Sequence, residues 1–300
     1  MGEIPQDPTT DRAPHPARAL AKLFEPFHSV GYYSREIHEL NDHGYRGWWH
    51  AYFAYRAAPL GPVGAPVVTA LFYNFAPRMV ARAVPGVWDI LAPAEVLTVR
   101  AKLVDRALRR SFGAEVASAD MTAAAQLARR AVEGADVAAR GLFAGHAGLE
   151  WPAPDDAHMV LWHACTLLRE HRGDSHNIAL AAAGVDGIEA HVLMAGRGHG
   201  NRPTIESIRG WTAGEWDAAV SRLVARGWAE PGGALTTGGL AGRSAIEAHT
   251  DELASEPIDR LGPAGTEELA GRLERLVGHL LSSGEVPGRW PPPTVLKPAG

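Results

Sequence analysis

Apolar residues recur every three or four positions along most of the chain, which is the period of an amphipathic α-helix. This pattern predicts helices over 17–40, 93–113, 120–143, 155–171, 212–227 and 265–284. Strand signals are scarce, and the clearest lies in 227–239, where Gly232 and Gly233 turn the chain between two short segments, as in a β-hairpin. The sequence therefore predicts a mainly α fold with one small hairpin.

The chain also matches itself. Three pairs of segments follow one another in the same order: 27–58 with 162–196, 92–113 with 212–233, and 127–154 with 269–293. Both series close on a Trp-Pro pair, at Trp151 and Trp290. We therefore predict two duplicated copies, at 20–153 and 154–293, between a disordered N-terminal tail (1–19) and a C-terminal tail (294–300). Such copies pack about a pseudo-two-fold axis, so we expect a pseudo-dimeric monomer or a homodimer.

Two stretches carry a resemblance to known proteins. Residues 209–253 contain a helix ending in LVARG, a hairpin, and a T-x-x-G that opens a long helix, and this order resembles the latter half of a MarR-type winged helix. Over nearly the whole chain, the succession FEPFHSVGYY, AYRAAPLGPV, FYNFAPRMVARAVPGVW, LWHACTLLREHRGDSHNIAL and RGWT resembles a family of actinobacterial helix-turn-helix-related proteins. The resemblance implies tandem winged-helix-derived halves arranged as a pseudo-dimer with a small β-hairpin wing. It implies no particular reaction.

Charge bears on the DNA-binding function that this resemblance suggests. A winged-helix reader needs polar or basic side chains on its recognition helix, and the candidate helix offers Ser221, Arg222 and Arg226. It begins, however, with Glu215 and Asp217, the hairpin carries no Lys or Arg, and the formal net charge is −5. Phosphate contacts supply most of the affinity for DNA, so the sequence disfavours DNA as a partner. A ligand-responsive MarR-like transcription regulator stays as the alternative function.

The densest chemistry lies in the stretch 161–180. Residues seven apart on a helix differ by about 20°, so His163 and Glu170 share one face, and His171 lies beside it. In the first copy, His28, Tyr32 and Arg35 make the matching stripe. Two copies packed about a two-fold axis would bring these stripes together, so we expect one shared pocket.

The residue types in this pocket point to a small organic ligand. Histidine moves protons near neutral pH, arginine holds anionic groups, and aromatic segments such as 47–55 and 72–77 line cavities. We expect His163, Glu170 and His171 to be catalytic. The expected ligand-binding residues are His28, Tyr32, Arg35, Trp49, Tyr73, Asn74 and Arg169. The predicted function is a protein or enzyme of specialised metabolism that handles a hydrophobic, aromatic metabolite by acid–base chemistry, with binding and catalysis both left open. A structural reading is that residues 169–174 form a charge network that ends the helix at Gly173.

Cofactor signals are weaker. No metal or cofactor is predicted, because the spacing of His171, Asp174 and His176 matches no established zinc signature. A divalent metal there, or a haem with His163 or His171 as axial ligand, stays as an alternative. The single cysteine, Cys165, has apolar neighbours and is expected to be a buried thiol. We find no signal-peptide pattern and no apolar run that spans a bilayer, so we expect a cytoplasmic protein with no membrane partner.

Overall fold

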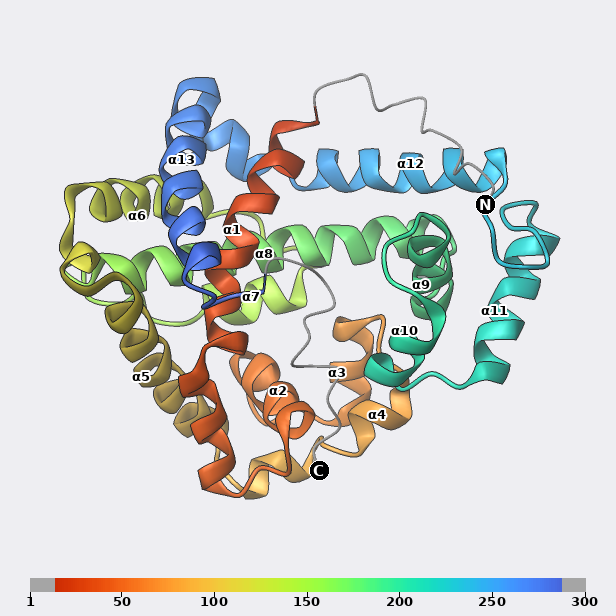
Figure 1. The fold of residues 1–300 in the computed structure, drawn as a ribbon, viewed down its shortest axis with the longest axis horizontal. Helices are drawn as coiled ribbons and strands as arrows, with labels where there is room; N and C mark the ends of the chain where they lie inside the picture. The colour runs from red at the N-terminus through yellow and green to blue at the C-terminus, as the bar shows by residue number, and fades with distance from the viewer. Residues whose placement is uncertain (1–13, 288–300) are drawn as a thin grey trace.

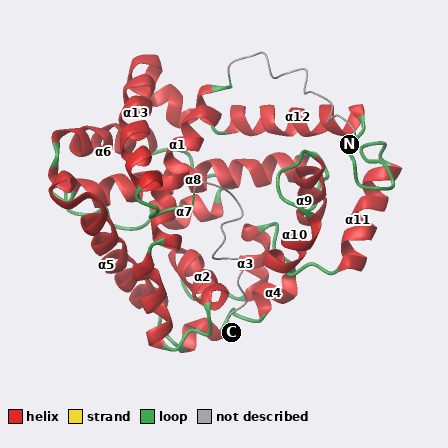
Figure 2. Cartoon of the chain, in the orientation of Figure 1, coloured by secondary structure: helices red, strands yellow, loops and turns green. Residues whose placement is uncertain are grey.

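The computed structural model describes residues 14–287, and within them the chain is a bundle of α-helices and short 3-10 segments without a β-strand (Figure 1, Figure 2). The prediction of a mainly α fold is confirmed. The α-helices are α1 Pro16–Tyr33, α2 Trp48–Ala57, α3 Ala65–Phe72, α4 Pro77–Ala81, α5 Pro93–Phe112, α6 Ala119–Val132, α7 Gly141–Ala147, α8 Ala157–Ala182, α9 Gly187–Gly196, α10 Arg202–Arg209, α11 Ala213–Ala225, α12 Thr237–Leu253 and α13 Glu256–Ser282. The 3-10 segments are η1 Arg35–His43, η2 Ala58–Leu60, η3 Gly86–Asp89 and η4 Gly113–Ala117.

Helix α8 is the central element of the fold. It packs against α1, α6, α7 and α12, and α13 in turn crosses α1 and α6 (Figure 1). Because other helices cover α8 on all sides, most of its residues between His158 and Ser175 are buried. Its buried positions include several polar and charged side chains, which therefore lie in the interior rather than on a solvated face.

The largest apolar core joins the two predicted copies. Phe27 of α1 and Met121 of α6 belong to the same buried cluster as Leu161 of α8 and Leu273 of α13. A second cluster centres on Phe53 and the helices α2 to α5. A third cluster contains residues from the end of α8 and from α9 to α12. Residues from 20–153 and from 154–293 thus share one core, which fixes the position of α1 against α8.

Four predicted helices have a boundary that differs from the structure. Helix α6 ends at Val132 rather than at 143, and α13 begins at Glu256 rather than at 265, with a kink at Gly262. Helix α1 ends at Tyr33, because Ser34 is extended (φ −59°, ψ 149°) and the chain continues as η1. Helix α8 runs through Gly173 to Ala182, so the expectation that the helix ends at Gly173 is wrong. A glycine inside a helix costs only about 1 kcal/mol, and the flanking contacts outweigh it. One of them joins the Asp174 carboxylate to the backbone N–H of Phe143 at 2.9 Å.

The segment that resembles a winged helix keeps its helices and loses its sheet. Thr236 caps α12 by accepting a hydrogen bond from the backbone N–H of Gly239 at 3.0 Å, as the T-x-x-G pattern indicates. The expected β-hairpin wing is reduced to one antiparallel bridge between Ala229 and Leu235, because the turn and the cap of α12 use up the residues on either side. In the first half, α5 is followed by η4, and no described residue there pairs as a strand. Of the predicted N-terminal tail (1–19), residues 16–19 belong to α1, and residues 1–13 lie outside the described residues. The predicted C-terminal tail (294–300) and Trp290 also lie outside them.

Among the described residues, no single helix combines the length and apolar character needed to cross a membrane. Helices α8 and α9 pass that test only when taken together, and the chain bends by 98° between them.

Candidate functional site

A fully buried carboxylate lies in the middle of α8. The side chain of Glu170 has no exposed surface, and its two oxygens accept hydrogen bonds from Arg56 of α2 at 3.2 and 3.4 Å. They also accept from Nη1 of Arg169, both at 3.0 Å. Burial raises the pKa of Glu170, but the guanidinium groups of Arg169 and Arg56 outweigh burial and hold this pKa well below its usual value. The carboxylate is therefore ionised inside the protein.

The charged groups form a path from solvent into the interior. Nε of Arg169 lies 3.4 Å from a carboxylate oxygen of Glu25, whose side chain is half exposed. Arg169 is 24% exposed, Arg56 is 9% exposed, and Glu170 is fully covered. We call Glu25, Arg56, Arg169 and Glu170 the charged cluster. Its outer edge meets water while its inner end lies in a low-dielectric surrounding.

Aromatic rings cover the inner end of the charged cluster. Nη1 of Arg56 donates to Tyr52 Oη at 3.3 Å, and its guanidinium lies 4.4 Å from the centre of the Phe72 ring. The Tyr32 ring lies 5.4 Å from that of Tyr52. A cavity of about 20 Å³ opens beside them and is lined by Tyr32, Tyr52, Tyr55 and Trp48, among other residues. That volume holds about one water-sized group.

His28 lies next to these aromatic rings, and one of its ring nitrogens has a hydrogen-bond partner. Its Nδ1 is 3.0 Å from Thr166 Oγ1, and its ring meets Tyr32 edge-on at 5.0 Å between centres. Nε2 is buried and has no hydrogen-bond partner. Burial lowers the pKa of His28 well below its usual value, and the positive charges of Arg169 and Arg56 add to that effect. The imidazole is therefore neutral at physiological pH.

His163 and His171 lie outside the charged cluster. His163 meets Trp151 edge-on at 4.8 Å, and His171 meets Phe143 edge-on at 5.0 Å. Burial, helped by His146, lowers the pKa of His163 to about 3, while burial and Arg140 lower that of His171 to about 4. Successive helix positions point about 100° apart, so His171 faces away from Glu170, and seven positions separate His163 from Glu170 by about 10 Å along the axis. The expected pocket shared by these three side chains is not formed.

Two further predicted ligand residues also lie elsewhere. Arg35 is exposed and pairs with its neighbour Glu36, because α1 ends before it and the predicted stripe is broken. Trp49 packs in the second apolar cluster, with its ring 5.6 Å from that of Phe75.

Tyr73 and Asn74 tie the turn after α3 to the second half of the chain. The Tyr73 hydroxyl donates to the backbone oxygen of Val185 at 2.6 Å, and the backbone oxygen of Asn74 accepts from Trp211 Nε1 at 3.0 Å. These contacts hold the turn after α3 against the segments that flank α9 and α10, and their partners are not members of the charged cluster.

Sequence reasoning missed Arg56, Tyr52 and His146. Arg56 could have been found because it is the single charged residue in the apolar run WWHAYFAYRAA. A charged side chain in such a run has no polar helix face to share and must find a partner in the interior. His146 donates Nδ1–H to the backbone oxygen of Leu142 at 2.9 Å. Burial lowers its pKa to about 4, and Arg100 acts in the same direction.

The candidate DNA-reading side chains are engaged within the protein. Arg222 pairs with Glu189 at 2.8 Å and with Asp186 at 2.6 Å. Arg226 donates to the backbone oxygen of Ala183 at 2.7 Å and stacks on a neighbouring tryptophan ring. Ser221 donates to the backbone of its own helix. The exposed face of α11 therefore offers no free cation from this predicted set.

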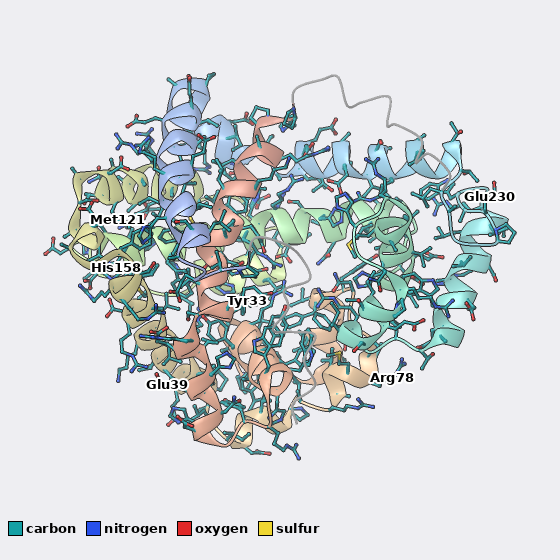
Figure 3. The ribbon with its side chains drawn as sticks, viewed as in Figure 1. Tyr33, Glu39, Arg78, Met121, His158 and Glu230 are labelled. Carbon is teal, nitrogen blue, oxygen red and sulfur yellow. The ribbon has the colours of Figure 1, made fainter. Side chains whose placement is uncertain are left out.

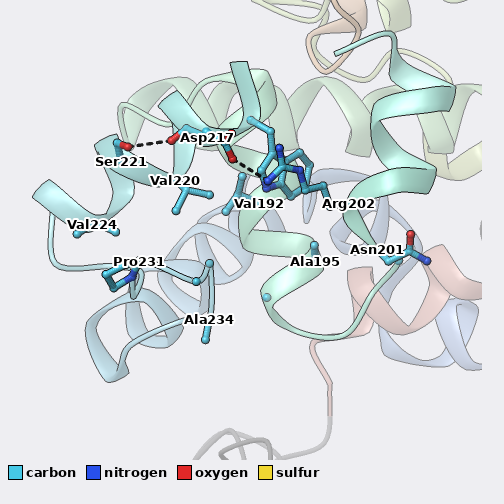
Figure 4. A pocket seen from close by; sticks show the side chains of 15 residues that line it. Val192, Ala195, Asn201, Arg202, Asp217, Val220, Ser221, Val224, Pro231 and Ala234 are labelled. Carbon is cyan, nitrogen blue, oxygen red and sulfur yellow. Dashed lines mark hydrogen bonds and ion pairs between the residues drawn. The ribbon is translucent and has the colours of Figure 1, made fainter. Parts of the chain in front are cut away.

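An open groove of about 870 Å³ lies between α9, α11 and the loop at 231–234 (Figure 4). Val192, Val220 and Val224 give it an apolar floor, and Arg202 is held at its rim by Asp217 at 2.7 Å. Arg78, on α4 (Figure 3), pairs with Glu215 of α11 at 2.6 Å, which joins α11 to the first half of the chain. The groove is lined by charges that are already paired.

Metal ligands do not converge in the described part of the chain, where no group of three or more His, Cys, Asp or Glu side chains could hold an ion. His171 packs on Phe143, Asp174 accepts from the backbone, and His176 Nδ1 lies 2.9 Å from Thr250 Oγ1. Burial raises the pKa of the Cys165 thiol well above its usual value, so this cysteine stays protonated.

The succession of α10, a tight turn, α11 and the capped helix α12 is a helix-turn-helix arrangement followed by a long helix. A family model described as a helix-turn-helix family matches residues 17–287. The chain belongs to this helix-turn-helix family. No curated protein and no solved structure matches it. Since the family match runs from α1 past the end of α13, the charged cluster lies inside the region that defines the family.

Proposed function

We propose that this helix-turn-helix family protein binds a small organic molecule at the charged cluster, and that its scaffold serves this site rather than DNA. The observation that carries the proposal is the fully buried Glu170, which is held by Arg56 and Arg169 beside the tyrosine rings. Clustered pKa shifts mark candidate functional sites, because functional sites often use burial and specific charge partners to set protonation states.

The energetics of burial support a functional reading of the charged cluster. Buried ion pairs seldom add net stability, because removing charges from water costs about as much as their attraction returns. An apolar trio packed in the same place would serve folding equally well. A protein that places three ionised side chains under its core is therefore a candidate for using them.

The proposed site draws on both predicted copies. His28 and Arg56 come from 27–58, and Arg169 and Glu170 come from 162–196, the two segments that match each other in sequence. A duplicated, winged-helix-derived pseudo-dimer would place one shared site at this junction. The aromatic rings around Tyr32 and Tyr52 suit a hydrophobic, aromatic metabolite, as expected for a protein of specialised metabolism. The pKa of Glu170 lies far below neutral, so this carboxylate suits binding better than proton transfer.

A binding screen tests the proposal. A set of small aromatic compounds is measured by ligand-observed NMR against the wild-type chain, Arg169→Met and Arg129→Met. Arg129 is the matched control, because it is a partly exposed arginine paired with a glutamate outside the cluster. We expect compounds that bind the wild type and Arg129→Met and lose binding in Arg169→Met. Equal binding to both variants would contradict the proposal.

The second candidate function is a ligand-responsive, MarR-like DNA-binding regulator, and the family membership favours it. The pairing of Arg222 with Asp186 and Glu189 counts against it, since phosphate contacts need available cations. A gel-shift assay on the upstream region of its own gene, at about 50 mM salt, decides the matter, because low salt favours every phosphate contact. A specific complex that Arg222→Ala weakens would support the regulator, and no retardation would exclude it.

A further inference from the structure

We propose that the C-terminal residues 288–300 dock on a row of aromatic side chains of α1 and α2, which we call the aromatic row. Its members are Tyr33, Trp48, Trp49 and Tyr52. The structure describes the chain as far as Pro287, and the sequence continues with GRWPPPTVLKPAG. This docking goes beyond the proposed function and does not depend on the ligand of the charged cluster.

The rings of the aromatic row stack on one another and reach the surface. The Tyr33 and Trp48 rings lie 6.1 Å apart with an interplanar angle of 12°, and the Trp48 and Tyr52 rings lie 5.1 Å apart with an angle of 18°. Trp49 meets Trp48 and Tyr52 edge-on, at 4.6 and 5.4 Å. All four residues are partly exposed. Such a group of partly exposed aromatic rings is typical of an interaction surface.

The described chain ends close to this row. Glu285 is 8% exposed, and its carboxylate accepts from Arg110 at 2.6 Å. The same guanidinium donates to Glu36 at 2.5 Å. Glu36 comes three residues after Tyr33, which corresponds to at most about 11 Å of chain. Helix α13 packs against α1 and ends beside it (Figure 1). The ion pairs therefore fix Pro287 near one end of the aromatic row.

The composition of residues 288–300 suits an aromatic surface. The run 291–293 consists of three prolines, which favour the polyproline II conformation. Segments of this kind bind grooves lined by aromatic rings, because their shape is preformed and little entropy is lost on docking. Trp290, just before the prolines, adds a large ring that can stack on the row. The first proline of the run lies four residues after Pro287, a distance of about 12 Å in polyproline II, so the run reaches the row.

The covalent connection favours the chain's own segment as the occupant. A segment on a short linker acts at an effective concentration on the order of 1 mM, so contacts too weak to hold a free peptide still keep the segment docked. Tyr52 belongs to the aromatic row and also accepts a hydrogen bond from Arg56 at 3.3 Å. The docked segment therefore lies next to the charged cluster.

Photo-cross-linking in the full-length protein tests the docking. Trp290 is replaced by the photoreactive residue p-benzoylphenylalanine, and cross-linked peptides are identified by mass spectrometry after irradiation. The label is placed in the otherwise wild-type chain and in three variants, Trp48→Leu, Trp88→Leu and the triple variant Pro291→Ser, Pro292→Ser, Pro293→Ser. Trp88 is the matched control, because it is a partly exposed tryptophan that packs against the same apolar cluster as Tyr52 and lies outside the aromatic row.

We expect cross-links within one chain to residues 33–52, in the otherwise wild-type protein and in Trp88→Leu. The yield should fall about fivefold in Trp48→Leu and in the proline variant, which is the factor that the loss of one aromatic contact produces. The proline variant changes only residues beyond Pro287, so it decides the outcome if Trp48→Leu fails to fold.

Three results would overturn the docking. They are the absence of cross-links, cross-links only to other parts of the chain, and a yield unchanged in both test variants. Cross-links found only between two chains would also overturn it and would make a second copy the occupant of the aromatic row. Each of these results leaves the proposed function untouched, because none of them involves the ligand.

Discussion

Replacing Glu170 with methionine should destabilise the protein more than any other single change in the charged cluster. Methionine has a similar length and is apolar, so little packing is lost. The substitution removes the carboxylate that neutralises two guanidinium groups, at 3.0 Å for Arg169 and 3.2 Å for Arg56. Arg56 is almost fully buried, so its charge is left unpaired in the interior.

The expected loss is about 3–5 kcal/mol in the free energy of unfolding, the usual cost of breaking a buried ion pair from one side. For a chain of this size, each kcal/mol lowers the melting temperature by about 2–4 °C, so the midpoint should fall by about 6–20 °C. Circular dichroism melts and urea titrations measure both quantities. The unpaired charge of Arg169 costs less free energy than that of Arg56, because the Arg169 side chain is partly exposed to water.

The combined variant Arg56→Met, Arg169→Met, Glu170→Met separates charge from packing. It removes all three charges together, so we expect it to regain most of the stability that Glu170→Met loses. A single variant Glu170→Met within about 1 kcal/mol of the wild type would contradict this prediction, since it would mean that water reaches the buried guanidinium groups. A triple variant as unstable as the single one would show that packing, not charge, decides.

Three further predictions concern other parts of the interior. Gly31→Ala should destabilise the protein by about 1–3 kcal/mol through overpacking, because the added Cβ would lie 2.2 Å from Tyr55 Oη; a melt unchanged from the wild type would contradict this. His163→Ala should lower the melting temperature by removing the contact with Trp151, while ligand binding in the folded fraction stays intact; loss of binding at unchanged stability would instead place His163 in the site. Stability should fall as the pH drops from about 6.5 towards 4, because the folded-state pKa of His146 is lowered to about 4 and that of His191 to about 3, so the unfolded chain takes up protons that the native chain cannot; urea midpoints that stay constant across this range would count against buried neutral histidines.

The sequence predicts the helices well because their apolar period is local information. The helix predicted over 93–113 is α5, and that over 212–227 is α11, each within a residue or two of its observed ends. The hairpin fails because the turn at Pro231 and the cap of α12 at Thr236 leave room for one bridge only. Local turn chemistry was right there, while the number of paired residues depends on the neighbouring helix.

The candidate site was partly predictable for the same reason. Arg169 and Glu170 lie in one titratable stretch, and the partnership of their helix with the one carrying His28 and Tyr32 follows from the matched segments. Arg56 is 114 residues away from Glu170, so no pattern within one helix could pair them. The grouping of His163 and His171 with Glu170 was an argument from helix phase, and phase does not say which neighbouring helix covers each face.

A small-molecule analysis of protein purified from its own cells tests most directly whether the charged cluster binds a ligand. Wild-type protein and the variants Arg169→Met and Arg129→Met are denatured, and the compounds released are identified by mass spectrometry. We predict an aromatic organic molecule that is released from the wild type and Arg129→Met and is absent from Arg169→Met. A compound released equally from all three proteins, or no compound from any, would contradict the claim that the charged cluster is the ligand site.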